Sequence, residues 1–562
     1  MTNPRRWRAI GVPGGWRSVS VVVVLAAALV SGICWSLASP IGASPDDDYH
    51  QASIWCPVPL SAGECGVERA ADGSLKSIEV PKSVAQSAAC FAFHPEVSGS
   101  CTTHISDTQT IRTDRFNKGE YPGAYYRVMH VFVGPWVERS VAMMRIFNVV
   151  LAVLLLGGLA LVANTGQRRL LGMALLAPMI PLGIFLTASV NPSGWAFVGV
   201  AVAALGLLIA ADAQTRTRHL VATGIAIVGA AQAVSARGDA GPYLCVTTAA
   251  VAIATVRWEK GWLLTRLPGF VVIGLIGLVT FVTNSQAGLI GSTPNKVIDK
   301  PTHLFYYNLT ELPNILIGMF GGWALGWLDN PMPAVVSSSS LFAAIFVIVT
   351  GIQRFPLRKA LSAGLIAIVL VALPLKLLQQ LGEKVGFWVQ PRYLLPLAPV
   401  LLALLAYDHV HRGAVRITRS QAVIAAVFIS LANALGLYTT LRRYLTGLDG
   451  PVILGRDIEW WWPDIPGPRV IFVMGAICFA VVAFAVLLAG SSWRPTSAVD
   501  APSAGPEDAG PSQRRLWKRT KAGQSTTAKD SAALTPPSSV PPTDRSDPPG
   551  PHAPESEQPV RT

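Results

Sequence analysis

The 562-residue sequence is poor in charged residues, which make up only 14% of the chain. A soluble protein of this size carries about a quarter. The sequence also lacks zinc-finger spacing, a P-loop and an HExxH motif, although its formal net charge is +13. Many of its basic residues lie in short segments between apolar runs, where positive charge sets membrane topology. These features exclude an ordinary soluble enzyme and argue against a nucleic-acid partner.

Long apolar runs take the place of charge, and hydrophobic residues make up 51% of the chain. Runs of about 18 residues or more can cross a bilayer as a helix. Continuous rather than alternating runs select helices over a closed barrel. The sequence therefore predicts an all-α polytopic integral membrane protein. We expect about twelve transmembrane helices, at residues 18–38, 141–163, 170–188, 194–211, 220–235, 241–256, 261–283, 338–352, 360–378, 393–406, 421–438 and 470–488.

Basic residues predict the orientation of these spans. Four arginines lie in the N-terminal segment, residues 1–17, which we therefore expect to be cytoplasmic. Alternation from there leaves each later cytoplasmic loop basic and places the tail, residues 491–562, inside as well. The tail is rich in Pro, Ser, Thr and Asp, a composition typical of disorder. The first span could instead be a cleaved signal peptide, but its length favours retention.

The cysteines and the irregular apolar segment lie in loops that we expect at the outer face. The first outer loop, residues 39–140, holds four of the seven cysteines: Cys56, Cys65, Cys90 and Cys101. An even set in one exported loop predicts two disulfides, with a metal site as the alternative, and leaves the pairing open. A second outer loop, residues 284–337, contains an apolar segment rich in Gly and Trp, residues 311–327. We expect this segment to be an interfacial or re-entrant helix.

An acidic cluster, Asp46, Asp47 and Asp48 with His50, begins eight residues past the first span. Adjacent carboxylates raise one another's pKa unless a cation neutralises them, which suits a general base or a divalent metal ligand. Asp46 and Asp48 have a D-x-D spacing that permits Mg²⁺ or Mn²⁺ but requires neither. No other cofactor is indicated. The alternative is a solvated loop whose aspartates cap a helix that begins near Tyr49.

Three stretches carry a family resemblance. "PDDDYH" (residues 45–50), directly after a first span, resembles the Pro-Asp-Glu-x-x-His signature of a bacterial family of polytopic membrane proteins of unknown function related to the GT-C glycosyltransferases. Asp47 stands where that signature has Glu. "GWLDNPMP" (326–333) and "VQPRYLLPLAP" (389–399) resemble later segments of the same family. The resemblance covers residues 18–490 and implies a GT-C-like transmembrane domain in a bacterial plasma membrane.

The resemblance also implies a reaction at the outer face. A polyprenyl-phosphate-linked sugar would be the donor, and an envelope glycan or lipid the acceptor. Asp46 or Asp47 would act as the base on the acceptor hydroxyl, with His50 as a positioning partner. The leaving phosphate gains negative charge, so outer cations should surround it. The expected substrate-binding residues are Arg392, Tyr393, Arg237, Asp329 and Trp327.

For Arg392 and Arg237, roles outside substrate binding stay open. Arg392 could be an interfacial anchor that reaches lipid headgroups, and Arg237 could form a loop ion pair with Asp239. Two other function classes stay open as well. A transporter or flippase of lipid-linked glycans predicts ionisable residues inside spans, whereas the expected spans are nearly free of charge, Lys376 being an exception. A non-catalytic scaffold for envelope assembly predicts that the acidic cluster is dispensable. We therefore favour a membrane glycosyltransferase.

Overall fold

The computed structural model describes residues 14–59, 65–283, 300–455, 458, 460–462 and 465–489, with side chains from residue 21 onward. The tail that we expect to be disordered lies outside these residues. So do most of the N-terminal segment and residues 284–299 of the second outer loop.

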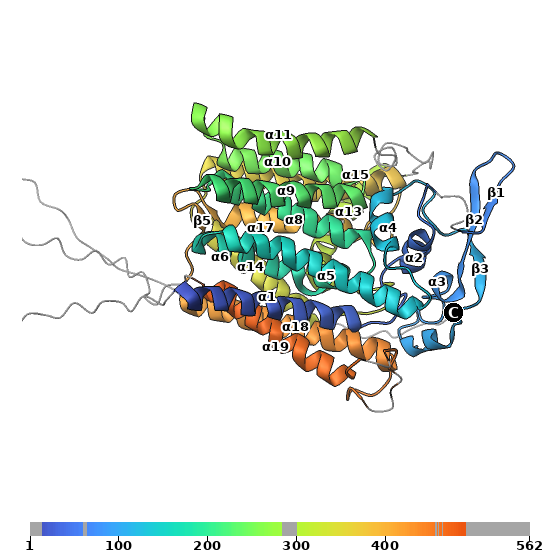
Figure 1. Ribbon diagram of the computed structural model, residues 1–562. Helices are drawn as coiled ribbons and strands as arrows, with labels where there is room; N and C mark the ends of the chain where they lie inside the picture. Colours follow the sequence, from blue (N-terminus) through green and yellow to red (C-terminus); the bar gives the residue numbers. More distant parts are fainter. Residues whose placement is uncertain are drawn as a thin grey trace, which may run out of the picture. The chain divides into compact units, whose positions relative to one another are not determined.

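Most of the described chain is helical, and its long helices run side by side (Figure 1). The helices of this bundle are α1 (Gly14–Leu37), α5 (Val137–Val162), α6 (Thr165–Pro178), α7 (Ile184–Thr187), α8 (Pro192–Ala211), α9 (Arg216–Ala236), α10 (Ala240–Thr255), α11 (Lys260–Thr283), α13 (Pro301–Ile317), α14 (Ala334–Ile352), α15 (Leu357–Leu381), α16 (Pro391–Leu394), α17 (Ala398–Ala406), α18 (Arg419–Thr446) and α19 (Pro468–Leu488). Short π- or 3-10 segments join some of them: η2 (Met179–Gly183), η3 (Gly318–Gly322) and η4 (Leu395–Leu397).

The polytopic helical class is confirmed. Within the described residues, nine helices are long and apolar enough to cross a membrane, and each coincides with an expected span. Three shorter apolar helices, Val21–Leu37, Ala240–Thr255 and Pro391–Ala406, coincide with the other three expected spans. The total of twelve crossings stays a prediction, because Ala240–Thr255 and Pro391–Ala406 are shorter than a full bilayer requires. Helix α1 as a whole has 24 residues.

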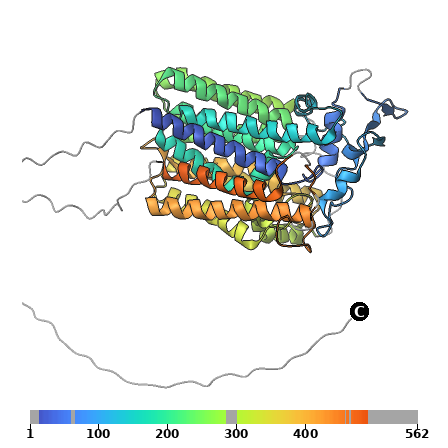
Figure 2. The same ribbon diagram turned by 60° about the horizontal axis from the view of Figure 1, so that its bottom comes forward.

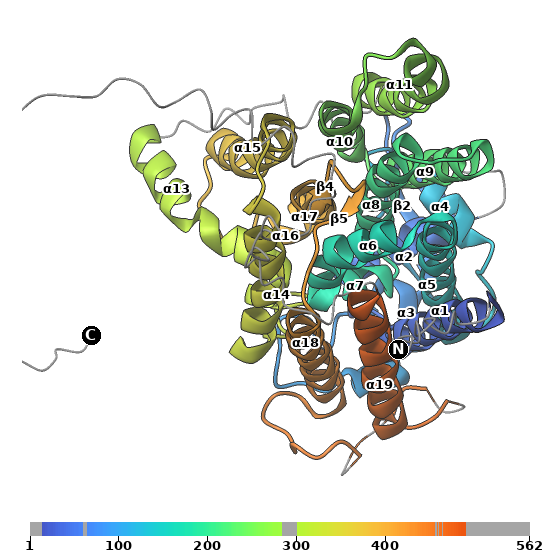
Figure 3. The same ribbon diagram turned by 90° about the vertical axis from the view of Figure 1, so that its left-hand side faces the viewer.

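Helix α8 forms the centre of the bundle, and every residue in it is buried. Its sequence is apolar on all sides, as a helix surrounded by other helices requires. Figure 3, which looks along the helices, shows α6, α9 and α17 around it. Gly199 of α8 meets Gly229 of α9 so closely that a Cβ atom on Gly199 would lie 2.4 Å from the Gly229 carbonyl oxygen. Small residues of this kind let two membrane helices approach.

The third expected span is interrupted. It continues from α6 into α7 through η2, where Ile180 leaves the helical conformation. Pro178 and Pro181 flank this residue, and neither can donate a backbone hydrogen bond, so the chain kinks there. The segment 311–327 is broken as well. Helix α13 ends at Ile317, and η3 contains Gly321 in a left-handed conformation with φ +90°. Its interfacial or re-entrant placement stays a prediction.

The first outer loop folds into a small domain at one end of the bundle (Figures 1 and 2). It contains an antiparallel sheet in the order β1-β2-β3. Its elements are α2 (Asp47–Trp55), β1 (Val67–Arg69), β2 (Leu75–Pro81), α3 (Lys82–Ala85), η1 (Gly99–His104), β3 (Thr110–Thr113) and α4 (Gly123–His130). A two-stranded pair, β4 (Tyr407–Asp408) with β5 (Gly413–Ala414), lies elsewhere, at the far end of α17. The two predicted disulfides are confirmed in this outer domain as Cys56–Cys65 and Cys90–Cys101.

Candidate functional site

The loop between α1 and α2 is fixed by two buried charged side chains, Arg145 of α5 and Asp47. The Arg145 guanidinium donates hydrogen bonds to three backbone carbonyl oxygens within residues 36–40, at 3.1, 2.8 and 2.7 Å. Asp47 accepts a hydrogen bond from the backbone N–H of Gly42 at 2.9 Å, and its carboxylate lies 3.8 Å from the guanidinium. Burial raises the pKa of Asp47 to about 6 even though Arg145 opposes the rise. Asp47 therefore shapes the loop and is closed to a substrate in this structure.

Asp46 lies in a different environment, with 41% of its side chain exposed. It precedes α2 in a left-handed conformation, φ +58°, which aspartate adopts more readily than most residues. Its side chain does not cap the helix. Instead, one carboxylate oxygen accepts a hydrogen bond from Arg392 at 2.8 Å. Burial acts to raise the pKa of Asp46, but the charge and hydrogen bond of Arg392, with a smaller effect of Arg115, hold it below its usual value.

Arg392 lies at the start of α16 and is only 8% exposed. Its Nη2 atom also donates to the Tyr393 hydroxyl at 3.3 Å. Its Nε atom is buried and has no hydrogen-bond partner in the described part of the chain. A guanidinium that is paired with one carboxylate and keeps an unused N–H group can donate to a further anionic oxygen, such as that of a phosphate. This environment differs from that of an anchor that reaches out to headgroups.

Arg237 forms the second cation of the site, and the loop ion pair with Asp239 is confirmed. The two side chains meet in a two-point arrangement, with distances of 2.9 and 2.7 Å. Arg237 also donates to the Ser193 hydroxyl at 3.2 Å. Its guanidinium lies over the ring of Tyr393, 5.1 Å from the centroid, and over that of Tyr121 at 5.7 Å. These contacts hold Arg237 rigidly beside Tyr393, and thus near Arg392.

His50 is buried on the inner side of α2. Its Nδ1 atom lies 3.0 Å from the Tyr126 hydroxyl, and its ring stacks on that of Tyr126 with an edge contact to Tyr121. Burial lowers the pKa of His50 to about 3. The imidazole is therefore neutral at physiological pH and sits in an aromatic wall behind Asp46. This placement suits a positioning partner better than a proton acceptor.

Asp46 and Asp48, the D-x-D pair that permits a divalent metal, are both engaged by arginines, and a metal site there stays a prediction. Asp48 makes a two-point ion pair with Arg115, at 2.7 and 3.2 Å, so its carboxylate is already neutralised by a cation. The described residues contain no group of three or more His, Cys, Asp and Glu side chains able to hold a metal ion.

Asp329 and Trp327, the expected contributions of the second outer loop, have different surroundings. Asp329 is buried and pairs with Arg443 of α18 at 2.8 Å. Arg443 also donates to backbone carbonyl oxygens of the outer domain, those of Phe91, His94 and Val97. The Asp329–Arg443 pair therefore fastens the outer domain to the bundle and is closed to a ligand. Trp327 is half-buried, and its indole N–H donates to the Gly42 carbonyl oxygen at 2.7 Å.

An apolar groove of about 350 Å³ begins at Arg237 and Tyr393. Side chains of three helices form its walls: Val246 of α10, Phe281 of α11, and Val369, Leu373 and Leu377 of α15. The polar groups in its lining lie at the Arg237 end, where Asp239 joins them. The site thus combines an exposed carboxylate, two buried guanidinium groups and an adjoining hydrocarbon-lined groove.

The arginines that pair with Asp47 and Asp48 were not predicted from the sequence. Arg145 lies inside the expected span 141–163, where an ionisable residue is itself a signal of a specific partner. Arg115 and Tyr121 lie in the outer domain without any motif around them, so nothing in the sequence singled them out. Their roles depend on contacts made only after the outer domain folds onto α2.

Comparison with known proteins adds one match. A family model described as "Predicted membrane protein (DUF2142)" matches residues 29–401, which is more than half of the chain and includes the loop of Asp46 and the segment of Arg392. No curated protein and no solved structure matches the chain.

Proposed function

The chain belongs to this family of predicted membrane proteins, and from its site we propose a glycosyltransferase activity. The enzyme would move a sugar from a polyprenyl-phosphate donor to an envelope glycan or lipid acceptor at the outer face of a bacterial plasma membrane. The proposal rests on one observation above all. The exposed carboxylate of Asp46 is paired with the buried guanidinium of Arg392, directly beside the polar end of an apolar groove.

The groove suits the donor lipid. Its walls are hydrocarbon, which complements a polyprenyl chain, and its polar end carries Arg237 beside Tyr393. A donor whose chain lies between α10, α11 and α15 would bring its phosphate to Arg237 and Arg392. Both guanidinium groups are buried, so a phosphate that shares them with their carboxylate partners, Asp46 and Asp239, would feel their charge with less screening than in water.

The reaction then follows from the charges. The acceptor hydroxyl oxygen forms a bond to the anomeric carbon of the sugar, while the bond from that carbon to the phosphate oxygen breaks. The hydroxyl proton passes to Asp46 and the polyprenyl phosphate leaves, with Arg392 and Arg237 offsetting its new charge. When Arg392 turns toward the phosphate, its hold on Asp46 weakens. The pKa of Asp46 then rises, which makes the carboxylate a better base when the donor is bound.

Replacement of Asp46 by Asn tests the proposal. We expect Asp46→Asn to reproduce the envelope-glycan profile and the accumulated polyprenyl-phosphate sugars of a deletion strain, at unchanged membrane abundance. Asp48→Asn is the matched control, since Asp48 is already paired with Arg115. A normal glycan profile in Asp46→Asn would overturn the catalytic assignment and favour a scaffold.

Purified protein separates a transferase from a transporter. In detergent solution there is no second compartment, so only a transferase forms product from polyprenyl-phosphate sugars extracted from the deletion strain. Product formation that depends on Asp46 supports the proposal. Complete absence of product from protein that restores the glycan profile in cells would favour the transporter or flippase.

A further inference from the structure

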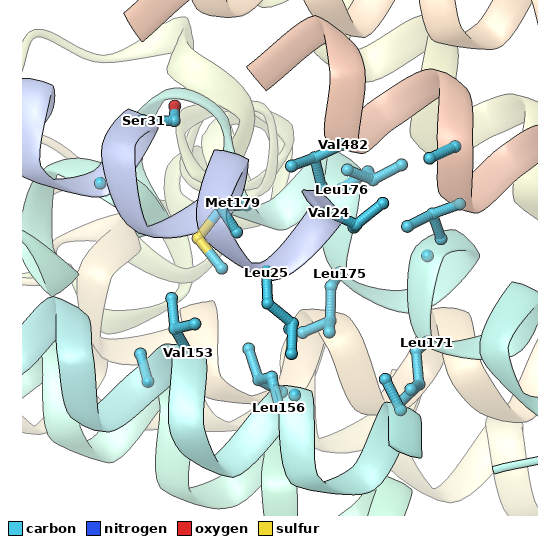
Figure 4. A pocket seen from close by; sticks show the side chains of 18 of the residues that line it. Val24, Leu25, Ser31, Val153, Leu156, Leu171, Leu175, Leu176, Met179 and Val482 are labelled. Carbon is cyan, nitrogen blue, oxygen red and sulfur yellow. The ribbon is translucent and has the colours of Figure 1, made fainter. Parts of the chain in front are cut away.

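A second, larger cavity of about 520 Å³ lies in the half of the bundle away from the outer domain. Four long helices surround it: the middle of α1, the second half of α5, α6, and the end of α19. Met179 of η2 and Ile184 and Thr187 of α7 complete the lining. Figure 4 shows Leu25 of α1, Leu156 of α5, Leu175 of α6 and Val482 of α19 lining this space. Its volume falls within the range of ordinary ligand pockets, roughly 300–1,000 Å³.

Hydrocarbon is the natural content of this cavity. Apart from Arg168, its polar lining residues are Ser31 and Thr187. Their hydroxyl groups donate to the backbone carbonyl oxygens of Gly475, at 3.3 Å, and Gly183, at 2.7 Å. Each hydroxyl oxygen can still accept, but a buried water needs two to four polar partners, and away from Arg168 the rest of the lining is apolar. An empty space would forfeit dispersion contacts along all four helices. An alkyl chain needs no polar partner and would restore the dispersion contacts.

The length of the cavity matches one leaflet. On α5 the lining runs from Val149 to Ala160, which at 1.5 Å per residue spans about 17 Å. That is roughly half of a hydrocarbon core about 30 Å thick. The occupant is therefore a lipid of the leaflet opposite the outer domain. The distribution of basic residues predicts that this leaflet is the cytoplasmic one.

Arg168 gives the cavity its charge. It lines the cavity at the first turn of α6, and its Nε atom donates to the Ala160 carbonyl oxygen at 2.8 Å. The charged neighbour that acts on it is another cation, Arg218. No described carboxylate forms an ion pair with either arginine, so no described acidic group offsets the charge of Arg168 at the cavity, and Arg218 adds positive charge near it. An anionic headgroup would compensate this positive charge.

We propose that this cavity binds an anionic glycerophospholipid, with an acyl chain between α1, α5, α6 and α19 and the phosphate at Arg168. The site is separate from the outer groove proposed for the donor. It takes a lipid of the opposite leaflet, and it requires no catalysis. Its occupant would join α1 and α19 to α5 and α6 in the half of the bundle that the outer domain does not hold.

Native mass spectrometry of purified, delipidated full-length protein tests the site. We expect phosphatidylglycerol to bind more tightly than phosphatidylcholine, and Arg168→Gln to reduce the affinity for phosphatidylglycerol about fivefold, the effect of one basic residue at a membrane surface. Arg354→Gln is the matched control. Arg354 is an exposed arginine in the loop after α14 and does not line the cavity. Equal affinities for the two phospholipids, or an equal loss in both variants, would overturn the proposal.

Two filling variants test the chain-binding part. Ala485→Phe and Ala28→Phe add a ring to the cavity from facing helices, and we expect both to exclude phosphatidylglycerol. Each should also remove the stabilisation by phosphatidylglycerol that wild-type protein shows in thermal unfolding, without lowering the unfolding temperature of the lipid-free protein. Retained phosphatidylglycerol binding in both variants would show that the assigned occupant is wrong.

Discussion

Asp46 and Arg392 form an ion pair of 2.8 Å between positions separated by 346 residues. The pair joins the start of the outer domain to the start of α16. It sets the ionisation of the carboxylate that we propose as the catalytic base. Arg392 and Arg115 both lower the pKa of Asp46, but Arg392 has the larger effect.

Substitution of Arg392 should therefore move the pH profile of the reaction. In Arg392→Gln the pKa of Asp46 rises, so the acid limb of kcat/KM should shift to higher pH, and kcat should fall because the leaving phosphate loses a cation. Initial rates across the acid range measure both effects. Arg115→Gln should shift the limb less, because Arg115 lies 3.8 Å from Asp46 and is half exposed. An unmoved limb in an active Arg392→Gln enzyme would contradict the assignment of Asp46 as the base.

Asp47 should make the protein less stable as the pH rises. Its pKa is about 6 in the folded protein and about 3.9 in an unfolded chain, so the folded state binds the proton more tightly. The contribution of Asp47 to stability is full below about pH 4 and is lost as the pH rises through about 6, by up to roughly 3 kcal/mol. Asp47→Asn cannot titrate and should lack this decline. Unfolding temperatures in detergent between these pH values measure the difference, and parallel curves for the two proteins would contradict it.

His50 should act in the opposite direction. Its pKa is about 3 in the folded protein and about 6.5 in an unfolded chain, so the unfolded state takes up the proton first. The contribution of His50 to stability is full above about pH 6.5 and is lost as the pH drops toward about 3. His50→Phe keeps an aromatic ring beside Tyr126 and should reduce this acid sensitivity. Because His50 and Asp47 offset each other near pH 5, each single variant must be compared with wild type; a His50→Phe curve that follows wild type would refute the argument.

The sequence alone could predict the helical class, nine of the spans and the disulfide-bearing outer loop, because these follow from local composition. It could also predict that Asp46 and Arg392 belong to one site. It could not predict that the three consecutive aspartates have different partners. The backbone at the start of α2 sends each carboxylate to a different arginine: Asp46 to Arg392, Asp47 to Arg145 and Asp48 to Arg115. That division depends on the left-handed Asp46 and on long-range contacts, which residue spacing does not encode.

The same division supplies positive charge that a divalent metal would otherwise bring to these carboxylates. Repulsion between neighbouring carboxylates can be relieved by one divalent cation or by several arginines. The chain brings three arginines from distant positions, and each carboxylate has a different main partner, although Arg115 also lies 3.8 Å from Asp46. The charge of Asp329 is likewise compensated by its buried partner Arg443. Asp329 therefore helps to hold the outer domain on the bundle and does not contact a ligand.

An aromatic pair at the outer surface gives the last prediction, which rests on the proposed activity. Phe93 is 55% exposed and adopts a left-handed conformation with φ +64°, which is rare for a bulky residue. Its ring centroid lies 5.5 Å from that of Trp327, in an edge contact. Trp327 is hydrogen-bonded to Gly42 in the loop that leads to Asp46. Exposed aromatic faces beside a catalytic loop suit the rings of an acceptor sugar.

We therefore expect Phe93→Ala to raise the KM for a glycan acceptor by up to about tenfold, the scale of one aromatic contact, while the KM for the donor stays unchanged. Phe93→Tyr should retain the wild-type value, because the ring face remains. Phe387→Ala is the matched control, since Phe387 is similarly exposed, at 52%, but packs on Trp388 just before α16 rather than beside the Gly42 loop. Initial rates at varied concentrations of delipidated envelope glycan provide the measurement. Equal effects of Phe93→Ala and Phe387→Ala would mean that the pair serves as an interfacial aromatic contact and that the acceptor binds elsewhere on the outer domain.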